Sequence, residues 1–116
     1  MPDLFHDILN HLKDEPINVD INITNFIKQL PYTKPDTADG TISIFKTLDH
    51  LKIKNYVVTS IFNSEGQTIP TNDEGEKHLK RNPRITLNEL RAIANITNDG
   101  LDYLEQKRRE KRKMNF

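Results

Sequence analysis

Cysteine and tryptophan are absent from the 116-residue sequence, and no apolar run approaches the length of a membrane-spanning helix. Without cysteine there is no disulfide framework, no thiolate zinc site and no cysteine nucleophile, and a reducing, cytoplasmic compartment is expected. Without about 18 consecutive apolar residues or a signal-peptide pattern, neither a membrane span nor secretion is expected. Only 34% of the residues are hydrophobic, which predicts a small core of Ile, Leu and Phe.

The sequence also lacks the patterns on which catalytic and metal sites are built. It has no Gly-rich phosphate loop, no Gly-x-Ser-x-Gly motif and no acid pair in an apolar setting. His6 and His11 are five positions apart, whereas two imidazoles that share a helical face for zinc are four apart. We therefore expect a protein that is not an enzyme and that holds no metal and no cofactor.

Charges of the two signs are equal in number, 17 of each, but they are unevenly placed. Residues 1–80 carry 8 Lys/Arg and 12 Asp/Glu, a net charge of −4, whereas residues 81–116 carry 9 and 5, a net charge of +4. Six of the seven residues from Lys107 to Lys113 are basic. This distribution indicates an acidic body with a basic end.

Apolar spacing predicts an α+β chain that is mostly helical. Helices are predicted at residues 3–14, 23–30, 41–54 and 71–80, and Pro16 and Pro31 end the first two. Residues 17–21 alternate between apolar and polar, as in a short strand or an extended link. Residues 56–62 are rich in β-branched and aromatic side chains, and a turn at residues 63–66 allows residues 67–70 to return as the second strand of a hairpin.

The predicted helix at residues 41–54 carries a continuous polar stripe opposite its apolar face. The stripe has the spacing i, i+3, i+4, i+7 and i+11 and consists of Ser43, Lys46, Thr47, His50 and Lys54. Its simplest interpretation is a solvated surface, and its functional interpretation is a ligand-binding face.

Residues 86–105 are open to more than one interpretation. Thr86 and Glu89 have the spacing of a capping box, and a helical face follows with Leu87, Leu90, Ile93 and Ala94. These features favour a helix at residues 86–94, then a last helix anchored by Leu101 and Leu104. In a second interpretation, residues 91–97 return as a strand and close a hairpin enlarged to almost thirty residues. A dimerisation hairpin is a third.

The order helix, extended link, two helices, hairpin and helix over residues 3–81 resembles a winged-helix domain. Residues 69–79 (IPTNDEGEKHL) are similar to the segment that leaves the wing in small bacterial and phage winged-helix regulators, and residues 86–105 separately resemble a helix-turn-helix. The resemblance implies a winged-helix-like core of three helices and a β-hairpin at residues 1–81, with a C-terminal helical extension at residues 82–116. In that family the third helix enters the major groove of DNA and the hairpin tip touches the DNA backbone.

Carried over to this sequence, the resemblance implies a DNA-binding protein with double-stranded DNA as its partner. The hairpin tip at residues 63–67 would touch the backbone, although Glu65 lies within it. The other expected contact residues are Ser43, Lys46, Thr47, His50 and Lys54 on the third helix, and Lys107, Arg108, Arg109, Lys111, Arg112 and Lys113 in the basic tail.

Such a protein would be a small transcriptional regulator or an accessory factor of a phage or mobile element, acting as a homodimer through its C-terminal helices. The alternative is a non-enzymatic protein-interaction module of a replication or regulatory complex. The net charge of −4 over residues 1–80 favours this alternative, because a DNA-facing body is normally basic.

Overall fold

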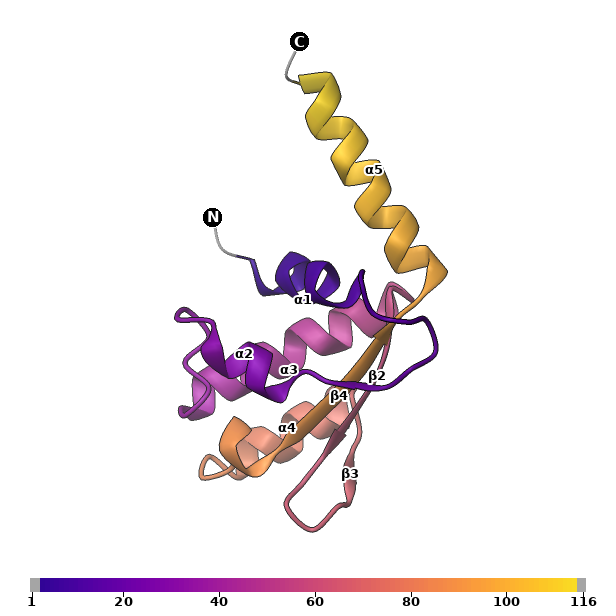
Figure 1. Ribbon diagram of the computed structural model, residues 1–116. Coiled ribbons are helices and arrows are strands. Elements are labelled where there is room, and N and C mark those ends of the chain that lie inside the picture. The colour runs from indigo at the N-terminus through magenta and orange to yellow at the C-terminus, as the bar shows by residue number, and fades with distance from the viewer. Residues whose placement is uncertain (1–2, 115–116) are drawn as a thin grey trace.

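Four strands form one antiparallel sheet, and the helices pack mainly on one of its faces (Figure 1). The computed structural model describes residues 3–114, and the side chains of residues 3–111. The elements are α1 (Leu4–Leu12), β1 (Ile21–Asn22), α2 (Thr24–Gln29), α3 (Ala38–Ile53), β2 (Val57–Phe62), β3 (Thr68–Ile69), α4 (Asp73–Arg81), a 3-10 turn η1 (Leu87–Glu89), β4 (Arg91–Ile96) and α5 (Asn98–Met114). None of the helices in this described range is long and apolar enough to cross a membrane.

The strand order is β1-β4-β2-β3, so the strand nearest the carboxyl end lies inside the sheet. Opposite Ala94 of β4 are Ile21 of β1 on one side and Thr59 of β2 on the other. Along β4, alternate side chains point into the core, and Ala92, Ala94 and Ile96 are almost completely buried. A central strand of the sheet is therefore supplied by a segment that comes late in the chain.

This strand corrects the helix predicted at residues 86–94. The capping box does form, because Glu89 accepts a hydrogen bond from the Thr86 backbone N–H at 2.8 Å. It caps only the single turn η1, and Leu90 is already extended. Residues 91–96 pair along their whole length with β2, and Ile93 and Ala94 also pair with β1. A helix at residues 91–96 would leave the facing backbone groups of β1 and β2 without these partners. The helix-turn-helix interpretation of residues 86–105 is therefore wrong, and the returning strand is correct.

The expected domain boundary between residues 81 and 82 does not separate two folded units. Residues 82–116 supply β4, which pairs with β1 and β2 from the preceding part of the chain. Helix α5 extends from the body and runs away from the end where α4 lies (Figure 1).

The remaining predicted helices and the hairpin are confirmed, with shifted ends. The third helix begins at Ala38 instead of Thr41, because the Thr37 side chain caps it by accepting from the Gly40 N–H at 2.9 Å. It ends where Asn55 adopts a left-handed conformation, with φ of 62°, which asparagine tolerates better than most residues. The β2–β3 hairpin pairs Ile61 with Ile69, as the β-branched run predicted.

Gly75 and Gly100 allow two helices to begin directly against neighbouring backbone. A Cβ on Gly75 in α4 would lie 1.8 Å from the Pro70 carbonyl oxygen and 2.7 Å from the Phe45 ring. A Cβ on Gly100 in α5 would lie 2.4 Å from the Tyr56 carbonyl oxygen. Gly75 therefore sets how closely α4 approaches α3.

We predict that Gly75→Ala destabilises the protein although alanine is the better helix former. The added methyl group meets backbone, which cannot move aside as a flexible side chain can, and overpacking of this kind costs about 1–3 kcal/mol. Urea denaturation measures the loss. Lys77→Ala, at an exposed position of α4, is the control and should stay within about 0.5 kcal/mol of the wild type. Equal stabilities for the two variants would contradict this close packing.

Candidate nucleic-acid interface

The polar stripe of α3 lies on the surface of the protein. Its opposite face is buried in the core through Ile44, Phe45, Leu48 and Leu51. Of the five predicted contact residues on the helix, one is half-buried: the Thr47 hydroxyl donates to the Ser43 carbonyl at 3.0 Å. The other four are exposed, namely Ser43, Lys46, His50 and Lys54. These four side chains are accessible to solvent, although His50 also contacts Phe5 of α1 and Lys46 contacts Glu76 of α4.

Helix α4 borders one side of the stripe, a neighbour that the sequence did not predict. Leu79 is buried in the shared core, and Lys52 of α3 donates to the Thr71 carbonyl just before α4 at 2.9 Å. On the surface, Lys46 of α3 lies 3.3 Å from Glu76 of α4, which also pairs with Lys80 at 3.1 Å. The i, i+4 pair of Glu76 and Lys80 is visible in the sequence, but the pair with Lys46 requires the tertiary structure.

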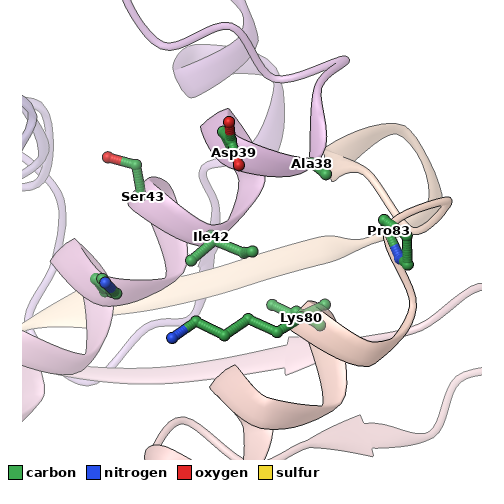
Figure 2. A pocket seen from close by; sticks show the side chains of 8 residues that line it. Ala38, Asp39, Ile42, Ser43, Lys80 and Pro83 are labelled. Atoms are coloured by element: carbon green, nitrogen blue, oxygen red, sulfur yellow. The ribbon is translucent and has the colours of Figure 1, made fainter.

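A groove of about 500 Å³ runs between α3 and α4 (Figure 2). Its walls mix apolar and charged side chains, contributed by Ala38, Asp39, Ile42, Ser43, Lys46, Leu79, Lys80 and Pro83. Two of the predicted contact residues, Ser43 and Lys46, line it, together with Lys80, which was not predicted. The candidate interface is therefore the exposed stripe of α3 together with the α4 side of this groove, and we refer to it as the α3–α4 face.

At the other end of the stripe, His50 joins an aromatic cluster formed by Phe5, Tyr56 and Tyr103. The ring centroids of Phe5 and His50 are 5.3 Å apart, and Tyr103 stacks on Tyr56 at 4.6 Å. The Tyr103 hydroxyl lies 2.7 Å from His6 Nε2. Burial raises the pKa of the Tyr103 phenol, so this hydroxyl stays protonated at neutral pH. This cluster fixes the first turns of α5 against α1 and α3.

The basic tail is a helical arm whose described cations are exposed and partly neutralised along α5. Arg108 and Arg109 pair with Glu105 at 2.7 and 3.5 Å, and Lys107 pairs with Glu110 at 3.5 Å. Of the six predicted tail residues, Lys107, Arg108, Arg109 and Lys111 are exposed. The side chains of Arg112 and Lys113 lie outside the described residues.

The α5 arm lies on the same side of the body as α1, away from the α3–α4 face (Figure 1). A groove of about 690 Å³ separates α1 from α5, with Asp3 and Asp7 on the α1 side and Lys107, Arg108 and Lys111 on the α5 side. In Figure 1, α5 extends from one end of the body and α4 lies at the opposite end. The two groups of predicted contact residues are therefore not brought together on one face.

The acidic charge of the body is concentrated at α1. Residues 3–15 contain four Asp/Glu and one Lys, whereas residues 38–54 and 73–84, which build the α3–α4 face, contain five Asp/Glu and seven Lys/Arg. The net charge of residues 1–80 therefore says little about this face. The hairpin tip remains poor in positive charge, since Glu65 is exposed there and its backbone N–H donates to Asn63.

Comparison with known proteins gave no relative: no family model, no curated protein and no solved structure matches this chain.

We predict that Tyr103 holds α5 to the body. Tyr103→Phe removes only the hydroxyl contact with His6 and should cost about 0.5–1.5 kcal/mol. Tyr103→Ala also removes the packing on Phe5 and Tyr56 and should cost more, about 2 kcal/mol for this half-buried ring. Hydrogen exchange of the backbone amides at residues 101–111 should then become faster in the alanine variant.

Gln106→Ala, on the exposed side of α5, is the control for this experiment and should leave the exchange unchanged. If Tyr103→Ala also leaves the exchange of α5 unchanged, other contacts hold the helix.

Proposed function

We propose that the protein is a non-enzymatic, winged-helix-like DNA-binding protein that contacts duplex DNA through the α3–α4 face. The observation that carries the proposal is the exposed row of Ser43, Lys46, His50 and Lys54 on a helix whose other side is fixed in the core. An α-helix fits the major groove of B-DNA, and side chains of these types can donate to base edges and phosphates. A small regulator or a phage or mobile-element accessory factor is the corresponding role.

The topology supports the same proposal. The chain runs through helix α1, strand β1, helices α2 and α3, and then strand β2, and β4 returns between β1 and β2. A winged-helix protein has the same order, with a hairpin that joins the last two strands. Here β3, α4 and η1 are inserted between those strands, so α4 takes a place beside α3. This support comes from likeness of fold, which is weaker than support from a site.

The direct test is fluorescence anisotropy with random-sequence duplex DNA over a salt series. The logarithm of the binding constant should fall linearly with the logarithm of the salt concentration, because each contacted phosphate releases counterions. Selection from a random duplex pool would then give the preferred sequence. The absence of any binding at low salt would rule the proposal out.

We predict that cations of the α3–α4 face matter more than those of the α5 arm. In Lys46→Ala/Lys54→Ala, the loss of the Lys54 phosphate contact should reduce the steepness of the salt dependence by about 0.9. The loss of Lys46, which is already paired with Glu76, should add less than this. The matched variant Lys107→Gln/Lys111→Gln removes equal charge from α5, whose cations lie beside the acids of α1. It should change the slope by less than half as much. The reverse order would make the arm the principal contact.

Protein interaction is a second candidate function, and the groove between α1 and α5 favours it. Asp3 and Asp7 line one side of that groove, Lys107, Arg108 and Lys111 line the other, and Leu101 and Leu104 contribute apolar surface. An amphipathic segment that carries charges of both signs would be complementary to it. Backbone NMR shifts separate the two functions. An amphipathic peptide with both acidic and basic side chains should shift α1 and α5, whereas duplex DNA should shift α3 and α4.

A further inference from the structure

Glu76 lies between two lysines of the α3–α4 face. Its Oε1 atom is 3.3 Å from Lys46 Nζ and 3.1 Å from Lys80 Nζ, so one carboxylate oxygen holds both ammonium groups. The Glu76 side chain is only 21% exposed, whereas those of Lys46 and Lys80 are 57% and 56% exposed. Both lysines therefore remain accessible from solvent while their common partner is recessed between them.

The carboxylate remains ionised under ordinary conditions. Its hydrogen bond to Lys80, together with the contact with Lys46, lowers the pKa of Glu76. One negative charge therefore offsets one of the two positive charges at this point. A phosphate that approaches either ammonium group must compete with a carboxylate already in contact with it.

The groove provides room for that competition. Lys46 and Lys80 both line it, along with Ser43 of the polar stripe of α3 (Figure 2). An anionic oxygen that enters the groove between Lys46 and Lys80 meets both ammonium groups. A phosphodiester of a duplex docked on α3 is an anion of this kind.

We propose that Glu76 is an internal competitor for DNA phosphate, which weakens sequence-independent binding by occupying Lys46 and Lys80. The inference rests on the proposed DNA-binding function. Phosphate contacts carry no sequence information, whereas base contacts do. A carboxylate that suppresses phosphate contacts while leaving Ser43 and His50 unchanged therefore raises the ratio of specific to non-specific affinity.

The test is Glu76→Gln, which removes the charge and keeps a side chain of nearly the same shape. Its affinity for random-sequence duplex at low salt should rise roughly five- to tenfold, and the salt slope should steepen by about 0.9 for each lysine released to phosphate. Binding to the selected sequence should gain less, so the ratio of the two affinities falls.

Glu74→Gln is the matched control. It removes the same charge from the same helix, but Glu74 is 76% exposed and pairs only loosely with Lys77, at 3.9 Å. It should raise the affinity less than twofold. The double variant Glu76→Gln/Lys80→Gln should keep only about half of the gain in slope, because Lys46 alone is then released. Thermal melts of all variants verify folding.

The outcomes separate the two proposals. If wild-type protein binds DNA but Glu76→Gln gains no more than Glu74→Gln, or binds more weakly, the role of Glu76 is refuted and DNA binding is not. If none of the proteins binds duplex at low salt, the proposed function itself is refuted. A gain that is undiminished in the double variant would also overturn the inference, because it would not depend on a released Lys80.

Discussion

Strand β4 is the constraint on which the other elements depend. It pairs with β1 on one edge and β2 on the other, and no other strand joins those two in the sheet. Thr24 extends the link, because its hydroxyl accepts from the Ala92 N–H at 2.8 Å and α2 is thereby fixed to the strand. The small side chains of Ala92 and Ala94 leave space above the centre of the sheet for the larger apolar residues of the helices.

The return of β4 also determines what lies beside α3. After the hairpin of β2 and β3, the chain must return to the middle of the sheet, where β4 lies between β1 and β2. Helix α4 is part of the connection from β3 to β4. Gly75 permits α4 to lie against Phe45 and the Pro70 carbonyl without a clash. The Lys46–Glu76 contact is a consequence of this route. The chemistry of the α3–α4 face is therefore set by topology as much as by the residues of α3.

Local patterns were sufficient to predict α1 to α4 and the hairpin. The first three helices and the hairpin show their apolar spacing within a dozen residues, and α4 shows a capped start with Leu79 facing inward. Local patterns were insufficient at residues 86–96. The capping box at Thr86 and Glu89 is real, but a cap cannot specify how far a helix continues. The inward residues of β4 include two alanines, which favour helix, and Ile93 is half-buried on the outer face, so the alternation typical of a strand is weak. Residues 91–96 form a strand because they pair with β1 and β2, and these pairings are non-local.

The candidate site divides in the same way. The exposed stripe of α3 follows from helical period alone, and its predicted members are exposed apart from the half-buried Thr47. The ion pair of Lys46 with Glu76 does not follow from the helical period, because the two residues are thirty positions apart and are brought together only by tertiary packing. The separation of the α5 arm from this stripe likewise depends on where β4 ends and on the aromatic cluster that receives Tyr103.

The net charge of zero is a poor guide to how strongly this protein would bind a polyanion. Helices α1 and α4 lie on either side of α3 (Figure 1), and a helix with its side chains is about 10 Å wide. The Debye length at physiological salt is about 8 Å, so the acids of α1 are largely screened from an anion at the α3–α4 face. Glu76, within 3.3 Å of Lys46, is not screened. One recessed carboxylate therefore affects the field at this face more than the several acids of α1.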